Sequence, residues 1–319
     1  MKRLVIGTRD NGAWLAQHLS CAFHAPDPNG SGLKGVSKVP LIDDTVWDEI
    51  VSVGNTSVPA GTLGFSPLNE RLQDPAIASA LFMGQGLAVS REPPTIALAN
   101  WWDKKWLGKS ALIHEQWPMM NRNLGAIGPY PQGVTATINT SDIFADELAK
   151  LEGLLTNYTG PVLTRWHVSS RAVEVVNLQL NFADGVWETL LELQDGPLLD
   201  NPMNLRDGRT ATGVLVSLAP YPFASCRPFE TIQTEEGGRK HFRLRDVHQV
   251  NDCLATNGAT GAAFYATAWG DSASSLDDCA REARMRVYRS LRSVRAGALQ
   301  YRTDISTLAH QAFADLRRL

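Results

Sequence analysis

The clearest chemical pattern in the sequence lies in one apolar segment, 173–182, which we expect to be a strand. Strand side chains alternate, so one face would carry Val173, Val175, Asn177, Gln179 and Asn181. The other face would carry Val176, Leu178, Leu180 and Phe182. Three neutral carboxamides offer dipoles but no anionic oxygen, so Mg²⁺ binding should be weak or absent. A half-exposed strand face without any ligand explains the same alternation equally well.

The sequence offers few carboxylates beside this segment and few candidate phosphate-binding groups elsewhere. Glu174 is the nearest carboxylate, and it would lie on the opposite face unless a bulge intervenes. Near the N-terminus, the turn 8–12 has a single glycine, at its last position, and contains Arg9, which could hold a phosphate group.

Arginines recur along the last long helix that we expect, at 275–298. They are Arg281, Arg284, Arg286, Arg289, Arg292 and Arg295. These side chains spread around the helix beside an apolar stripe, which favours a solvated face over a phosphate or nucleic-acid patch.

Tryptophans and histidines offer further candidate groups. Trp101, Trp102, Trp106 and Trp117 cluster beside lysines, and core packing or a protein interface is favoured over base stacking. His114 and His167 fall in apolar strands, where satisfied core histidines are more common than ligands. The four cysteines form no closely spaced pair, which argues against zinc and disulfides.

Composition excludes several protein classes. The 319 residues are 44% hydrophobic and carry 30 basic and 33 acidic side chains, a net charge of -3. This balance favours neither nucleic acid nor an acidic membrane. The first apolar run, 4–6, is too short for a signal peptide, and no run approaches the ~20 residues of a membrane span. We therefore expect a cytoplasmic globular protein.

Local patterns predict an α/β protein that begins with strand, loop and helix. We expect helices at 13–19, 67–86, 141–155 and 275–298. We expect strands at 4–6, 50–53, 96–102, 110–116, 162–168, 173–182, 212–219 and 262–268. Consecutive prolines at 93–94 predict a boundary. The expected units are an N-terminal nucleotide-domain-like α/β domain (1–94), a core (95–205) and a C-terminal α+β domain (206–319).

Four stretches, in order, resemble the phosphoribosylamine-glycine ligase (glycinamide ribonucleotide synthetase) family of ATP-grasp enzymes. They are 64–67 (GFSP), 119–125 (MMNRNLG), 213–219 (GVLVSLA) and 298–305 (ALQYRTDI). Together they span nearly the whole chain. The resemblance implies that 95–205 is an ATP-grasp core, that 119–125 is a substrate loop containing Arg122 and Asn123, and that the tail containing Arg302 is the family's C-terminal signature.

The same resemblance implies losses. The lysine-bearing lid that covers ATP would fall between Met83 and Ile96, where this chain has only a short proline-containing link. Asn177, Gln179 and Asn181 stand where the family has a metal-binding glutamate, a metal-binding asparagine and a substrate-binding arginine, and Asp184 follows them. ATP and Mg²⁺, which the family uses, are therefore not expected as cofactors.

Two functions are compatible with these features. The first is binding of a small amine, amino-acid or nucleotide-like ligand, or of a protein partner or second copy, without ordinary ATP- and Mg²⁺-dependent ligation. The second is an enzyme that forms or transfers at a carbon-nitrogen bond using a pre-activated substrate. The ligand-binding candidates are Asn177, Gln179, Asn181, Asn123, Arg122, Arg9, Asp184 and Arg302. Membrane binding is not expected, and support for nucleic acid is weak.

Overall fold

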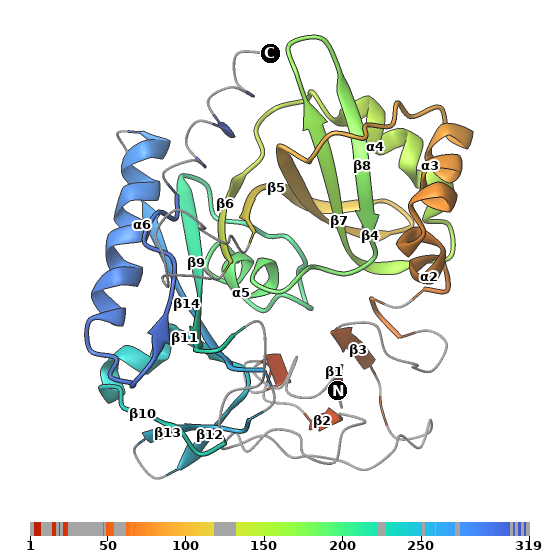
Figure 1. Ribbon diagram of the computed structural model, residues 1–319. Helices are drawn as coiled ribbons and strands as arrows, with labels where there is room; N and C mark the ends of the chain where they lie inside the picture. Colours follow the sequence, from red (N-terminus) through yellow and green to blue (C-terminus); the bar gives the residue numbers. More distant parts are fainter. Residues whose placement is uncertain are drawn as a thin grey trace.

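The computed structural model describes residues 3–7, 15–16, 19, 22–24, 47, 49–53, 62–64, 66–117, 132–221, 228–250, 253–258, 260–271, 275–306, 309, 312–313 and 316. It is a mixed α/β structure in which one large antiparallel sheet crosses the molecule (Figure 1). No helix formed by these residues has both the length and the apolar character needed to cross a membrane.

The N-terminal unit contains a small parallel sheet in the order β2-β1-β3. Its strands are β1 (Arg3–Gly7), β2 (Ala22–His24) and β3 (Glu49–Val53). Leu4, Val5 and Ile6 of β1 are fully buried, as expected for the central strand of a parallel sheet. This agrees with the predicted α/β start of the chain.

The large sheet has nine strands in the order β11-β14-β9-β6-β5-β4-β7-β8, with β15 paired to β9. Its strands are β4 (Ile96–Asp103), β5 (Trp106–Gln116), β6 (Gly133–Ile138), β7 (Thr159–Val168), β8 (Val173–Gln179), β9 (Arg209–Leu218), β11 (Phe242–Leu244), β14 (Ala262–Asp271) and β15 (Leu299–Gln300). A separate antiparallel sheet contains β10 (Thr231–Ile232), β12 (Val247–Val250) and β13 (Cys253–Thr256).

Helices cover the large sheet (Figure 1). They are α2 (Leu68–Gln73), α3 (Pro75–Gly84), α4 (Ala145–Leu151), α5 (Val186–Leu190) and α6 (Leu276–Leu291). Two 3-10 helices, η2 (Glu152–Leu154) and η3 (Glu236–His241), are also present. In the first helix pair and in α6, side-chain caps from Asp74 and Ser275 accept hydrogen bonds from first-turn amides.

Three large apolar clusters hold these layers together. One joins β1 and β3 to the sheet face that carries Trp101 and to α5 with Trp187. The second lies on the opposite face, under α2, α3 and α4, around Phe82 and Trp166. The third packs α6 against β9 and β14. The sheet therefore has two different faces near β7 and β8, one toward the helices and one toward the N-terminal unit.

The structure corrects three helix boundaries. The predicted helix 67–86 is two helices, because Asp74 is extended and caps a new helix that starts at Pro75. The predicted helix 141–155 begins only at Ala145, since the Ser141 hydroxyl accepts a hydrogen bond from the amide of Ile143 in a turn. The last helix ends at Leu291 instead of 298.

Candidate functional site

A cleft of about 750 Å³ opens on the face of β7 and β8 that points toward the N-terminal unit. Its lining comes from β3, β5, β7, β8 and the segments after β8 and before β6. Four of its polar side chains are central to the site, namely Glu115, Arg165, Asn177 and Gln179. Predicted candidates Asn181 and Asp184 also reach this lining.

Arg165 lies at the centre of the cleft floor and is only 7% exposed. Its Nε and Nη2 donate to the two carboxylate oxygens of Glu115, at 2.6 and 2.8 Å. This is a bidentate, charge-neutral pair. Strand β4 lies between the strands of Arg165 and Glu115, and its residue Ala97 is paired with Arg165. The exposed indole of Trp117 lies over the guanidinium, with its ring centroid 5.3 Å from Cζ.

The remaining nitrogen of Arg165 fixes the two carboxamides. Nη1 donates to Oδ1 of Asn177 and to Oε1 of Gln179, both at 3.2 Å. A guanidinium has donors only, so each amide must turn its oxygen toward it. The NH₂ groups of both amides are therefore the atoms left for another molecule. The cleft floor offers hydrogen-bond donors in place of acceptors.

A magnesium ion does not fit this arrangement. Mg²⁺ requires oxygen ligands, and the two amide oxygens already accept from the guanidinium of Arg165. A cation there would have to displace those bonds and would face the positive charge of Arg165. Glu115, the carboxylate of the floor, has both oxygens bound to Arg165. Within the described part of the chain, no cluster of three His, Cys, Asp or Glu residues has metal-binding geometry.

A register shift in β8 corrects the predicted face assignment. Asn177 pairs with Arg165 and Val175 pairs with Trp166, so Val176 is an extra residue opposite this pair. As a result Val175 packs in the same cluster as Leu178, not beside Asn177. The bulge also brings Glu174 onto the carboxamide side of the strand, although it does not line the cleft.

Asn181 is bound entirely within the protein. It is 3% exposed, and its Nδ2 donates to the carbonyl of Ser52 in β3 at 2.9 Å. Its Oδ1 accepts from the amide of Phe182 at 2.8 Å and from Nε1 of Trp187 at 2.9 Å. The bond to Ser52 ties the segment after β8 to the N-terminal sheet, and the other two hold that segment against α5. We therefore assign Asn181 a positioning role in the cleft wall.

The rim of the cleft at Asp184 carries a second charged group. Nη2 of Arg245 donates to Asp184 at 2.8 Å, and its Nη1 donates to the fully buried Glu188 at 3.0 Å. Burial raises the pKa of Glu188 to about 7, and the charge of Arg245 opposes that rise. The Asp184 side chain remains 48% exposed, so its carboxylate can still accept from a ligand.

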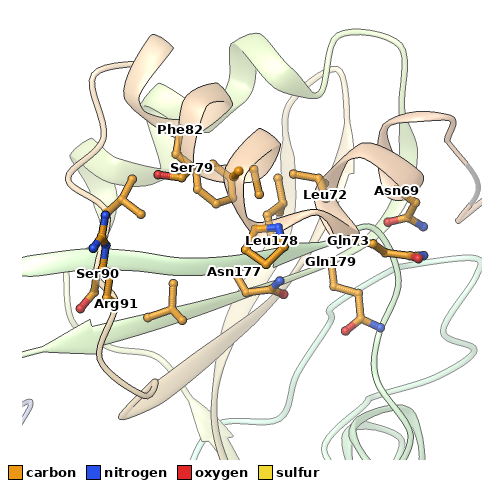
Figure 2. A pocket seen from close by; sticks show the side chains of 15 residues that line it. Asn69, Leu72, Gln73, Ser79, Phe82, Ser90, Arg91, Asn177, Leu178 and Gln179 are labelled. Carbon is orange, nitrogen blue, oxygen red and sulfur yellow. The ribbon is translucent and has the colours of Figure 1, made fainter.

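A second hollow, of about 1030 Å³, lies along the outer edge of β8 (Figure 2). It shares Val176, Asn177 and Gln179 with the cleft. Figure 2 shows Leu178 turned toward the helices α2 and α3, while the Gln179 carboxamide points away from them. The two amides therefore stand at a strand edge between two concavities.

The other predicted candidates fall elsewhere. Arg302 is buried, donates to both carboxylate oxygens of Asp304 at 2.8 Å and to the carbonyl of Trp117 at 2.7 Å, and does not line the cleft. Arg9, Arg122 and Asn123 lie outside the described residues.

Sequence reasoning missed Arg165 and Glu115, the pair that organises the floor. The available signal was a charged residue within each of two predicted strands, Glu115 in 110–116 and Arg165 in 162–168.

The tryptophans follow the favoured interpretation. Trp101 and Trp102 are buried on opposite faces of β4, in two different apolar clusters. Trp106 packs edge-on against Trp102, with ring centroids 4.9 Å apart. Only Trp117 of this group is largely exposed, and it lines the cleft.

His114, on β5, gives a pH-dependent prediction. Burial, and then the charge of Arg302, lowers the pKa of His114 from 6.5 to about 4. The unfolded chain therefore binds a proton that the folded protein excludes between these values. The free energy of unfolding should fall as pH drops from about 6.5 to about 4, by up to ~1.4 kcal/mol per unit from this group.

Urea unfolding of the wild type and of His114→Gln across this pH range measures the effect. The slope should be smaller in His114→Gln, while His167→Gln, a change at a half-buried histidine on β7, serves as the matched control. Equal slopes in the wild type and His114→Gln would contradict the assignment.

Comparison with solved structures shows which fold this chain has. Phosphoribosylamine-glycine ligase from Thermotoga maritima is similar over 95% of this chain and 99% of its own, with 13% identity and a TM-score of 0.68. The fold is ATP-grasp-like. Phosphoribosylglycinamide synthetase from Anaerococcus prevotii matches over 93% of this chain and 99% of its own, with 9% identity and a TM-score of 0.57.

A larger enzyme shares the ATP-grasp-like fold over part of its length. Pyruvate carboxylase from Rhizobium etli matches 98% of this chain but 37% of its own, with 14% identity and a TM-score of 0.56. No protein-family model matches this sequence, and no curated protein has significant sequence similarity to it. At these identities the similarity shows the fold alone.

Proposed function

We propose that this ATP-grasp-like protein binds a small ligand rich in hydrogen-bond acceptors, an amino acid or a nucleotide-like molecule, in the cleft and without Mg²⁺. One observation supports this proposal above all: Arg165 engages the oxygens of both Asn177 and Gln179. Their NH₂ groups suit a carboxylate, phosphate or carbonyl oxygen. The charge of Arg165 is balanced by Glu115, so binding depends on directed hydrogen bonds more than on net charge.

An amino acid carries one group suited to each kind of polar side chain in the lining. Its carboxylate would accept from the amides of Asn177 and Gln179, and its ammonium would donate to the exposed carboxylate of Asp184. The names of two neighbours state that they act on phosphoribosylamine and glycine or make phosphoribosylglycinamide. These names supply the two ligand classes for this chain as part of the proposal.

The link between α3 and β4 supports binding without ordinary ligation. Residues 85–95 connect the two elements and form one isolated bridge, Val89 to Val175, with no helix or further strand. Phosphoryl transfer from ATP depends on cationic groups and metal that hold the phosphates in place. This segment provides no subdomain to carry them.

Calorimetric titration with glycine and with AMP, each in EDTA, tests the proposal. At least one of them should bind, and Asn177→Ala or Gln179→Ala should weaken that binding about tenfold, the cost of one hydrogen bond to a charged group. Gln249→Ala, which removes a carboxamide from the separate sheet at β12, should leave affinity unchanged. Equal binding by all four proteins would refute the site.

The neighbours' ligase names favour one second function, formation or transfer at a carbon-nitrogen bond with a pre-activated substrate. Mass spectrometry of glycine incubated with the protein and an acyl phosphate distinguishes this enzymatic function from ligand binding alone. If the wild type forms a product and Asn177→Ala does not, the protein is an enzyme and the binding function is wrong.

A further inference from the structure

The C-terminal end of α6 borders a hollow of about 590 Å³ that is separate from the cleft. The hollow lies between this helix end and the segment 233–235, just before η3, and Figure 1 shows η3 beside the lower end of α6. Three of its lining side chains are exposed arginines, Arg289, Arg292 and Arg295. Arg289 and Arg292 are three residues apart at the end of the helix, and Arg295 is held beside Gln233 by an isolated backbone bridge.

The arginines of α6 divide into two groups. The three that precede Arg289 have partners: Arg281 pairs with Asp278, Arg286 pairs with Glu282, and Arg284 donates to the carbonyl of Thr303. In contrast, no ion pair within the described residues involves Arg289, Arg292 or Arg295. The paired group fits the solvated face that the sequence favours.

Helix capping accounts for only part of the second group. Cations near a helix C-terminus are stabilised by the helix dipole, and Nη1 of Arg295 donates to the carbonyl of Arg292 at 2.9 Å. No such bond is made by the guanidinium groups of Arg289 and Arg292 to other described residues. Glu235, the acidic residue of the hollow, forms no ion pair with any of the three arginines within the described part of the chain.

A hydroxyl adds a neutral donor to this positive hollow. Oγ1 of Thr234 accepts from Nε of Arg239 at 2.5 Å. Its own proton is therefore directed elsewhere and can be donated to a ligand. Three guanidinium groups and one hydroxyl form a set of donors that matches an anion with several oxygens.

We infer that this hollow binds a phosphate group of a small molecule. Arg289 and Arg292 would donate to its oxygens, Arg295 would balance its charge, and Thr234 would orient it. The site is independent of the cleft, since no residue lines both.

Titration of the full chain with pyrophosphate, by calorimetry at low ionic strength, tests the inference. The wild type should bind pyrophosphate, and Arg289→Gln or Arg292→Gln should weaken the binding about tenfold. Arg281→Gln removes the same charge from the same helix outside the hollow, so it should retain wild-type affinity. Asn177→Ala should also retain it, which separates this site from the cleft.

Several results would overturn the inference. These are absence of pyrophosphate binding, equal weakening by Arg281→Gln, or loss of binding in Asn177→Ala. A further arm uses a twelve-residue oligothymidylate at the same phosphate concentration. Tight binding of the oligonucleotide without binding of pyrophosphate would assign the arginines to a nucleic-acid surface instead.

Discussion

Replacing Arg165 with methionine should lower the free energy of unfolding by about 3–5 kcal/mol, because it leaves Glu115 as a buried, unpaired carboxylate. The side chains of this pair are 9% and 10% exposed, so water cannot fully replace the lost bonds. Asn177 and Gln179 would lose the donor that orients their oxygens. Equilibrium denaturation in urea measures the change.

A surface ion pair provides the control for Arg165. Lys109 and Asp207 are joined at 2.7 Å, but their side chains are 42% and 80% exposed. Lys109→Met should therefore cost less than about 1 kcal/mol. The double variant Arg165→Met with Glu115→Leu should recover much of the stability, since no buried charge remains. A loss below 1 kcal/mol in Arg165→Met would contradict the described pair.

The second large effect is expected at Asn181. Changing it to alanine should reduce the free energy of unfolding by about 3–5 kcal/mol, because the amide of Phe182 and Nε1 of Trp187 would lose their buried acceptor. The bond to the carbonyl of Ser52 would also be lost, which would loosen β3 from the large sheet. Urea unfolding, followed by tryptophan fluorescence, reports both changes.

Gln179→Ala is the matched comparison for Asn181→Ala. Gln179 stands two residues earlier and is partly exposed at the cleft, so its removal should cost less than about 1.5 kcal/mol. Similar losses in the two variants would show that Asn181 is no more structural than its neighbour. Normal stability of Asn181→Ala with loss of ligand binding would return it to the ligand-binding group.

The sequence predicted the strands well where apolar residues follow one another without interruption. The expected strands 96–102 and 262–268 correspond to β4 and β14, and the ATP-grasp resemblance agrees with structures only 9–14% identical. Helix 67–86 failed because Pro75 also suits the first turn of a new helix, and Asp74 provides its cap. Residue types alone did not distinguish one continuous helix from two consecutive helices.

The candidate site was only partly predictable, for physical reasons. Alternation identified Asn177 and Gln179, but the bulge at Val176 moves Val175 to the other face, and a bulge depends on pairing with β7. Arg165 and Glu115 are 50 residues apart on strands that are not neighbours. Their contact requires the strand order β5-β4-β7, which only the fold reveals. The two predicted domain boundaries, after residues 94 and 205, remain predictions.

The direct measurement of the central claim is a calorimetric titration of MgCl₂ into the wild type and into Arg165→Met, provided that the variant is folded under the conditions used. We expect no saturable heat from the wild type, because Arg165 engages the amide oxygens and Glu115. In Arg165→Met the freed carboxylate and amides should bind the ion. Saturable Mg²⁺ binding by the wild type that disappears in Asn177→Ala would show that the cleft is a metal site and that the account is wrong.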